Sequence, residues 1–353
     1  MSYIDKYITL FLEMLAIPAL SRDEADRASL LEKWMKAEGL AVKRSGNNLL
    51  VSGKRASGKP GLLLCSHIDT VPPVKGWQKD PFTPIIHGNQ ITALGANDAG
   101  ASVIAMLAAF MMLLDTGGTL EPFLLLCAEE EISGKGGLEM MLPELKDVRL
   151  ALVGEPTGMQ PAVAQRGLMV VDAIVRGESG HAARNEGKNA IMLAMEEIRK
   201  IADLRFAEKS AWLPEPSLQV TMIQAGTAHN VVPDECRFVI DVRSNDRYNN
   251  AEILTMLQDL TTAELQPRST RLKATRLSDG HPLHEVFHKM GYKAFGSLTL
   301  SDMALLPFPS VKIGPGDSAR SHTAGEWITI NEIQEGMDGY VAIGRKILSL
   351  DWK

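Results

Sequence analysis

The sequence has little cysteine, no excess of positive charge and no long uninterrupted hydrophobic run. Its 353 residues include three cysteines, Cys65, Cys127 and Cys236, and each lies in an apolar, strand-like stretch. We therefore expect buried reduced thiols rather than a disulfide framework. A formal net charge of −6 gives no reason to expect nucleic acid or an anionic membrane as a partner.

Targeting and membrane-spanning segments are also not recognisable. The stretch "MSYIDKYITLFLEMLAIPAL" mixes charges into a helical pattern and lacks the basic and apolar regions of a signal peptide. No segment reaches the ~20 apolar residues that a membrane-spanning helix needs. There is no internal repeat and no low-complexity linker. These absences predict a soluble, cytoplasmic protein.

Strand and helix patterns alternate in the first half of the chain. Helices are expected at 5–16 and 22–39, strands at 48–53 and 61–67, and a buried helix at 98–114. The apolar runs "EPFLLLCA" and "LALVG" predict two further strands. This alternation predicts an α/β layer with a mostly parallel sheet flanked by helices.

The pattern changes at about residue 166, where strands and helices follow in the order β-α-β-β-α-β. That order is typical of an inserted α+β, ferredoxin-like domain. We therefore expect a first domain from residues 1–165 and 278–353, and an inserted domain at 166–277. A chain of this length has room for both.

Polar motifs follow three of the apolar strands: "SHIDT", "AEEE" and "GEPT". Because parallel sheets place their sites at the carboxyl ends of strands, we expect these motifs to lie together. His67 and Asp69 face the same way on a strand. Asp98, in the glycine-bounded loop "ALGANDAG", could be a helix N-cap or a ligand.

The three consecutive carboxylates Glu129, Glu130 and Glu131 repel one another, and a nearby cation would relieve that cost. A solvated acidic loop is the simpler explanation, but an apolar strand leads straight into the triplet. Glu155 and His322 add further candidate ligands. Two histidines and this many carboxylates exceed one tetrahedral zinc site and favour two metal ions with a shared ligand.

The order of the motifs "SHIDTVP", "GAND", "EEEISGKGG", "GEPT", "GESGHAAR", "GTAHNVVPDEC" and "DVR" resembles a known family. It is the co-catalytic zinc deacylase and exopeptidase family, which includes acetylornithine deacetylase, succinyl-diaminopimelate desuccinylase, aminoacylase and glutamate carboxypeptidase. The resemblance covers nearly the whole chain. It implies a catalytic domain of the zinc-exopeptidase type with an inserted lid and dimerisation domain.

Carried over residue by residue, the resemblance implies two Zn²⁺ ions per chain, or Co²⁺ in their place. Their ligands would be His67, Asp98, Glu131, Glu155 and His322, with Asp98 bridging the ions. Asp69 would orient His67, and Glu130 would be the general base. Since the family's triplet is usually Asp-Glu-Glu, Glu129 stands at its Asp. Ala99 and Gly100 occur where many members have a lysine.

The resemblance also implies roles for residues outside the metal site. His181 would donate to the oxyanion, often across a dimer interface, so a homodimer through the lid domain is expected. The expected substrate contacts are Arg166, Asn230, Arg243 and Ser301.

The resemblance is nearest to biosynthetic N-acyl deacylases, so the first expectation is a small-molecule substrate, N-acetyl-L-ornithine, hydrolysed to L-ornithine and acetate for arginine biosynthesis. Desuccinylation of N-succinyl-ornithine or N-succinyl-diaminopimelate, a metallo-di- or tripeptidase, and an inactive binding homologue are alternatives.

A second zinc motif competes with this site. "HPLHEVFHKM" contains the H-E-x-x-H pattern of zinc proteases at His284 to His288. A third ligand is missing, because Ala294 stands where the extended motif has histidine and no glutamate occurs between Glu285 and Glu326. Proline near the start and glycine at the end are typical of an ordinary helix. We therefore expect a surface helix here.

Overall fold

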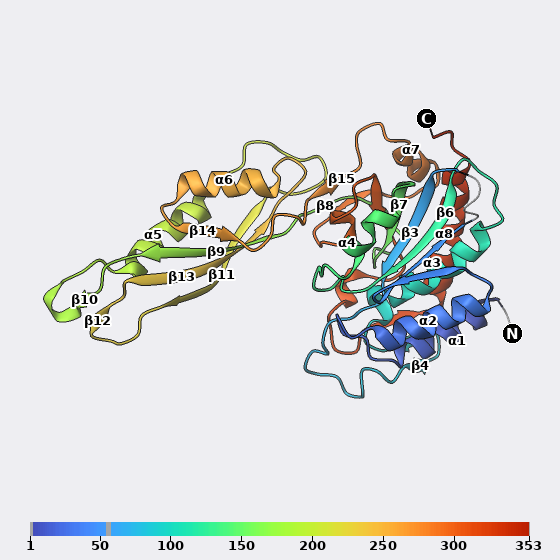
Figure 1. Cartoon of the computed structure of the whole chain (residues 1–353), viewed down its shortest axis with the longest axis horizontal. Helices are drawn as coiled ribbons and strands as arrows, with labels where there is room; N and C mark the ends of the chain where they lie inside the picture. Colours follow the sequence, from blue (N-terminus) through green and yellow to red (C-terminus); the bar gives the residue numbers. More distant parts are fainter. Residues whose placement is uncertain (1–2, 54–57, 353) are drawn as a thin grey trace. The chain divides into compact units, whose positions relative to one another are not determined.

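The computed structural model describes residues 3–53 and 58–352, which form two compact units (Figure 1). Unit 2 consists of Ala164–Arg276 and Gly296–Leu300, and unit 1 of the rest. Residues 296–300 therefore belong to unit 2, although the sequence placed them in the first domain. The backbone N–H of Arg166 donates to the carbonyl oxygen of Ser297 at 3.2 Å, which fastens this short segment to the start of unit 2.

A nine-stranded mixed sheet has most of its strands in unit 1, while β15 and parts of β8 and β16 belong to unit 2. In spatial order it comprises β1 (Val42–Ser45), β2 (Asn48–Ser52), β6 (Glu121–Cys127), β3 (Gly61–His67), β7 (Val148–Gly154), β17 (Ser310–Lys312), β8 (Ala162–Gln165) and β15 (Thr275–Arg276), with β16 (Phe295–Ser297) paired to β8. The strands β6, β3, β7 and β17 pair with one another in parallel, and the pairings β1–β2, β2–β6, β17–β8 and β8–β15 are antiparallel. This is the α/β arrangement that the sequence predicts.

Helices surround this sheet (Figure 1). They are α1 (Tyr3–Leu15), α2 (Ala25–Ala37), α3 (Ala101–Leu113), α4 (Leu138–Met141), α7 (Pro282–Lys289) and α8 (Ile330–Leu348). A small antiparallel sheet of β18 (Trp327–Thr329), β5 (Gln90–Thr92) and β4 (Ile85–His87) completes the unit. The helices expected at 5–16 and 22–39 are α1 and α2.

The helix α3 is apolar on all sides because it packs inside the unit. By length and composition the helical stretch Ala96–Leu113 could cross a membrane, but 83% of it is buried within the fold. It is therefore a core helix, as its all-round apolar pattern predicts. All seven residues of β3 are buried, which is typical of a parallel strand covered on both faces. The three cysteines are free and buried.

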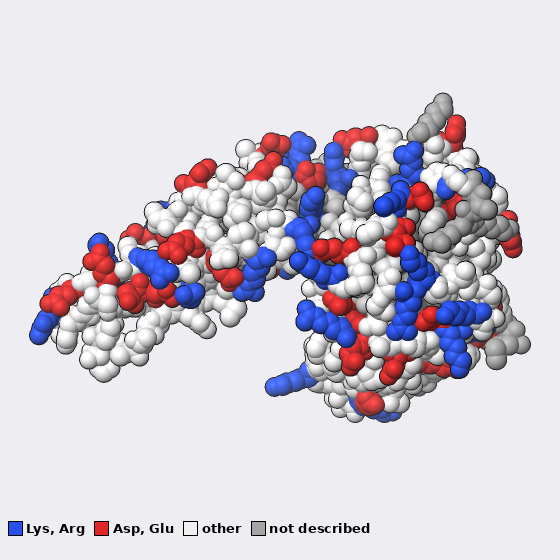
Figure 2. All heavy atoms as spheres, viewed as in Figure 1, with Lys and Arg blue, Asp and Glu red and all other residues white. Residues whose placement is uncertain are grey.

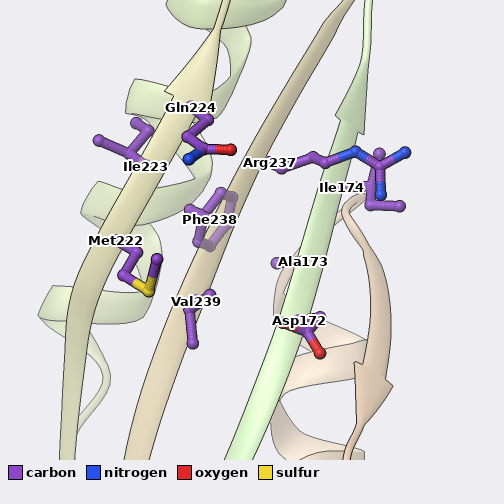
Figure 3. Close-up of a pocket in the computed structure, with 9 residues that line it drawn as sticks. All are labelled: Asp172, Ala173, Ile174, Met222, Ile223, Gln224, Arg237, Phe238 and Val239. Atoms are coloured by element: carbon purple, nitrogen blue, oxygen red, sulfur yellow. The ribbon is translucent and has the colours of Figure 1, made fainter.

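Unit 2 contains the antiparallel sheet β11 (Ser217–Ala225), β13 (Glu235–Arg243), β9 (Met169–Arg176) and β14 (Glu264–Pro267), in that spatial order. With α5 (Ala190–Asp203) and α6 (Asn250–Leu260), the chain order is the expected β-α-β-β-α-β. Burial alternates along β9 and β13, as in a sheet covered on one face. A hollow of about 190 Å³ lies along β9, β11 and β13 (Figure 3).

In unit 2, β10 (Gly180–His181) in the segment after β9 pairs with β12 (Val231–Val232) in the segment between β11 and β13. The two form a short antiparallel ribbon.

Candidate metal centre

Three neighbouring parallel strands end in the polar motifs that the sequence singled out. His67 is the last residue of β3, the acidic triplet at 129–131 follows β6, and Glu155 follows β7. β3 lies between β6 and β7 and is parallel to both, with His67 in register with Cys127. The carboxyl ends of the three strands therefore meet at one edge of the sheet, where α/β sheets place their ligand sites.

The imidazole of His67 is oriented by Asp69. Its Nδ1 lies 3.0 Å from the backbone oxygen of Asp69 and 3.4 Å from Oδ1 of the same residue. These acceptors favour the tautomer with the proton on Nδ1, so Nε2 is the atom available to a metal. Nε2 lies 3.3 Å from Asp98 Oδ1 and 3.9 Å from Glu155 Oε1. Burial opposes the charged ring, but Asp69 and Asp98 outweigh it and raise the pKa of His67 well above its ordinary value.

Asp98 lies between the two predicted histidine ligands. Its Oδ1 faces His67, and its Oδ2 lies 3.7 Å from Nε2 of His322. The same Nε2 lies 3.0 Å from Oε2 of Glu131. This hydrogen bond is the main reason that the pKa of His322 is raised to about 9. A carboxylate that faces two imidazoles through different oxygens has the geometry of a bridging ligand.

Two residues of the acidic triplet lie among these candidate ligands. Glu131 belongs to a group with His67 and Asp98, and Glu130 to a group with His67 and Glu155. Within each group the potential ligand atoms lie within 4.8 Å of one another. The two groups share His67, so they form one continuous cluster.

Glu129, in contrast, turns back toward its own loop. Its backbone oxygen accepts the N–H of Gly134 at 2.8 Å, and its Oε2 accepts the N–H of Gly136 at 3.3 Å. A Cβ at Gly134 would lie 1.9 Å from Oε2 of Glu129, so only glycine allows this approach. The first glutamate of the triplet therefore shapes the loop "SGKGG".

Asp69 also positions the backbone of the triplet. Its Oδ1 accepts the N–H of Glu130 at 3.0 Å, and its Oδ2 accepts the N–H of Glu131 at 3.1 Å. The hydroxyl of Ser21 donates to the same Oδ2 at 2.7 Å. One buried carboxylate thus holds both the ring of His67 and the backbone of Glu130 and Glu131.

The residues present fit two divalent cations. Burial, followed by the charge of Glu155, raises the pKa of Glu130 well above its ordinary value. Burial, followed by the charge of Asp98, raises the pKa of Glu155 to about 8. Among the residues that the structure describes, the buried Oε1 of Glu131 has no hydrogen-bond partner. Cations would relieve the repulsion and complete this oxygen's coordination, and imidazole with carboxylate suits zinc.

Two basic residues of the site were not expected from the sequence. Lys312 on β17 is 2% exposed and pairs in register with Val153 of β7, two residues before Glu155. Burial lowers the pKa of Lys312, and Glu155 is its strongest charged partner. A lysine inside the apolar run "SVKIG" was the available signal. Arg27 of α2 donates to the carbonyl oxygen of Ile68 at 2.8 Å and so supports the bend after β3.

The remaining predicted residues lie elsewhere. His181 and Asn230 are neighbours near the ribbon of unit 2, where the N–H of Ala182 donates to the carbonyl oxygen of Asn230. Arg166 and Arg243 also lie in unit 2. Burial lowers the pKa of Arg166, and the positive charge of Arg243 lowers it further. Ser301 lies in unit 1, where its buried hydroxyl caps a short 3₁₀ helix.

The competing H-E-x-x-H motif lies on α7, an amphipathic helix. His281 is its N-cap and Pro282 its first residue. Gly291, with φ +79°, follows its end, and the N–H of Tyr292 bonds back to Phe287, as in a glycine-terminated helix. Across residues 3–53 and 58–352, no group of potential metal ligands includes either histidine of the motif. The structure therefore has a helix here, as the sequence predicts.

Comparisons with known proteins agree with this fold. Residues 163–269 match the peptidase dimerisation domain family. An acetylornithine deacetylase of Proteus mirabilis is 29% identical, with 93% of each chain covered. One from Photorhabdus laumondii is 27% identical over 97% of this chain and 95% of that protein.

Solved structures share the architecture at lower identity. The aminopeptidase PepT of Bacillus cereus superposes with a TM-score of 0.79, 22% identity and 98% coverage of both chains. The YXEP protein of Bacillus subtilis, described as a dinuclear metal-binding peptidase of the M20 family, gives a TM-score of 0.74 at 15% identity, again covering 98% of both. These structures confirm the predicted fold class, and the curated relatives confirm the family resemblance.

Proposed function

We propose that this chain, a metal-dependent hydrolase whose relatives are M20-type deacetylases and peptidases, cleaves the amide bond of an N-acylated amino acid. The first candidate substrate is N-acetyl-L-ornithine, which would give L-ornithine and acetate, a step that serves arginine biosynthesis. The observation that carries the proposal is Asp98, whose two carboxylate oxygens lie 3.3 Å from Nε2 of His67 and 3.7 Å from Nε2 of His322. The curated relatives named acetylornithine deacetylase support the choice of substrate.

The proposed cofactors are two Zn²⁺ ions, with Co²⁺ as a replacement. One ion would be held by His67 and Glu155, the other by Glu131 and His322, with Asp98 shared. Ions bound there would polarise the amide carbonyl and make an attacking water more acidic. Asp69 would keep His67 in the tautomer that offers Nε2.

Glu130 is the proposed general base. It belongs to the group with His67 and Glu155, and Oδ1 of Asp69 accepts its backbone N–H at 3.0 Å. Its carboxylate would take the proton of the attacking water, and it would return that proton to the amine as the carbon–nitrogen bond breaks. The net reaction adds one water across the amide and leaves Glu130 in its starting protonation state.

Residues of unit 2 and Ser301 are proposed to act on the substrate. His181 would donate to the oxyanion as it forms. Arg166 and Arg243 would bind the substrate carboxylate, and Asn230 would contact the substrate nearby. Within the described part of the chain, the buried Nε of Arg166 has no hydrogen-bond partner, which leaves this guanidinium one unused donor.

A peptidase is the second candidate function. Its support is the architecture shared with PepT and with a tripeptidase of Staphylococcus aureus, which is 22% identical with a TM-score of 0.77. A desuccinylase would use the same machinery with a larger acyl pocket. An inactive binding homologue is disfavoured, since the sequence retains Asp98 and Glu130, the residues proposed to bridge the ions and to act as the base.

A substrate panel tests the proposal. With zinc or cobalt supplied, we expect N-acetyl-L-ornithine to be hydrolysed with a kcat/KM about 10-fold or more above those of N-succinyl-L-ornithine, N-succinyl-diaminopimelate and a tripeptide. A ninhydrin-type assay measures the free amine that hydrolysis releases. Preference for a succinyl substrate or the tripeptide would select that alternative, and hydrolysis of none would refute the substrate class.

A homodimer through unit 2 is also proposed, together with a cytoplasmic location. β11 is an edge strand, and its Met222 and Ile223 are 56% and 53% exposed. Met192 and Met195 of α5 are 58% and 56% exposed. An exposed apolar edge strand can pair with the same strand of a second copy of the chain. The match of residues 163–269 to a dimerisation domain supports this interface.

Adding negative charge to α5 tests the proposed dimer interface. The double substitution Met192→Glu and Met195→Glu should give a monomer at concentrations where the wild-type chain is a dimer, because it would bury two carboxylates. Sedimentation velocity measures the mass. The matched control is Met112→Glu, at a methionine of unit 1 that is 39% exposed. A wild-type monomer, or a double variant that still dimerises, would refute this interface.

A further inference from the structure

We infer that Glu326 is a positioning residue that holds the loop of Asp98 in place and couples it to the segment carrying His322. The inference rests on the proposed two-metal centre and adds to it a residue that no ligand motif includes. Glu326 lies four residues after His322, just before β18, and is 2% exposed.

The carboxylate of Glu326 accepts three backbone N–H groups from one loop. Its Oε2 accepts the N–H of Gly95 at 3.0 Å. Its Oε1 accepts the N–H groups of Asn97 and Asp98, both at 2.8 Å. A buried carboxylate needs such donors to replace water, and three donors from one loop fix the position of that loop.

Asn97 connects the same two segments in the opposite direction. Its Oδ1 accepts the N–H of Asp317 at 3.0 Å, while its Nδ2 donates to the carbonyl oxygen of Asp317 at 3.0 Å and to the hydroxyl of Ser321 at 3.2 Å. Asn97 is fully buried. A Cβ at Gly316, where φ is +89°, would lie 2.3 Å from Oδ1 of Asn97, so the contact requires glycine.

The hydrogen bonds of Glu326 and Asn97, together called the clasp, are expected to affect the binding of the two proposed ions unequally. His67 ends a buried strand, and Glu155 directly follows another, so the sheet holds the ligands of the first ion. His322, with φ +57°, lies in an exposed loop, and Asp98 lies in the short turn Ala96–Gly100 with a non-helical backbone conformation. The bonds of the clasp join these two segments. We therefore expect its loss to weaken the second ion, bound by Glu131 and His322, more than the first.

The test is metal titration of the Glu326→Gln variant of the full chain. Glutamine keeps the size and one oxygen acceptor, but its amide group would oppose the N–H of Gly95 or those of Asn97 and Asp98. We expect affinity for the second Zn²⁺ to fall by about 10- to 100-fold, with the first affinity within about threefold of wild type. Competition with a chromophoric chelator measures both constants, and the Co²⁺ spectrum reports the second site independently.

The matched control is Glu197→Gln in unit 2. Glu197 is 6% exposed and accepts the N–H and hydroxyl of Thr262, so it too is a buried carboxylate with a backbone donor. Its substitution should leave both metal affinities unchanged. Should Glu326→Gln fail to fold, Asn97→Ala carries the same expectation, because it removes the other half of the clasp.

Unchanged affinities, or equal losses at both ions, would overturn the inference, since a merely structural role weakens the whole site. Uptake of fewer than two ions by the wild-type chain would overturn the two-metal centre and this inference with it. The titration needs no substrate, so a wrong choice of substrate does not affect it.

Discussion

Replacing Glu130 by glutamine is expected to lower the rate of amide hydrolysis by about 10²- to 10⁴-fold while two metal ions stay bound. Glutamine has the same shape but cannot take up a proton. The backbone of residue 130 would keep its bond to Asp69, since that bond uses the N–H group. Steady-state kinetics and metal analysis of the same sample measure the two quantities.

Glu129→Gln is the matched control for this prediction. It makes the same chemical change one residue earlier, in a side chain whose Oε2 contacts Gly136 of its own loop. We expect kcat to stay within about tenfold of wild type, as for a loop contact without a role in proton transfer. If Glu129→Gln lost activity and Glu130→Gln kept it, the general base would be Glu129.

The second large effect concerns the metal ions. His67→Ala and His322→Ala should each reduce the metal content from two ions toward one, and lower kcat/KM by about 10²-fold or more. Each removes an imidazole that faces Asp98 from a different side, at 3.3 Å and 3.7 Å. Elemental analysis of the purified variants gives the metal content.

The control is the double variant His284→Ala and His288→Ala. Both histidines belong to the H-E-x-x-H sequence of α7, and neither occurs in a group of potential ligands in the described chain. Metal content and turnover should stay at wild-type values. If this double variant lost metal while His67→Ala and His322→Ala kept two ions, the metal site would lie on α7.

Much of the grouping of side chains at the candidate metal centre could be predicted, because several of the candidate ligands directly follow recognisable strands. An apolar run that ends in "SH" or "EEE" marks the carboxyl end of a buried parallel strand, and such ends meet at one edge of a sheet. The family resemblance then assigned roles to His67, Asp98 and Glu155. The structure gathers these side chains in unit 1.

The contacts that orient the ligands could not be predicted in the same way. Asp69 was expected to orient His67, but its bonds to the N–H groups after β6 were not, because every residue except proline has an N–H and the pattern carries no signal. Glu326 had no distinguishing feature either. It lies 231 residues from Gly95, to which it bonds.

What the sequence by itself determined is therefore the local part: which runs become buried strands, where each strand ends, and which polar residues follow. These depend on neighbours in the chain, through apolar periodicity and turn chemistry. Tertiary structure alone decided which of the two candidate zinc motifs lies among other potential ligands, that Glu129 turns back toward its own loop, and how Glu326 bonds to a distant segment. Those outcomes depend on packing between segments far apart in sequence, where geometry and burial, rather than residue type, select the contacts.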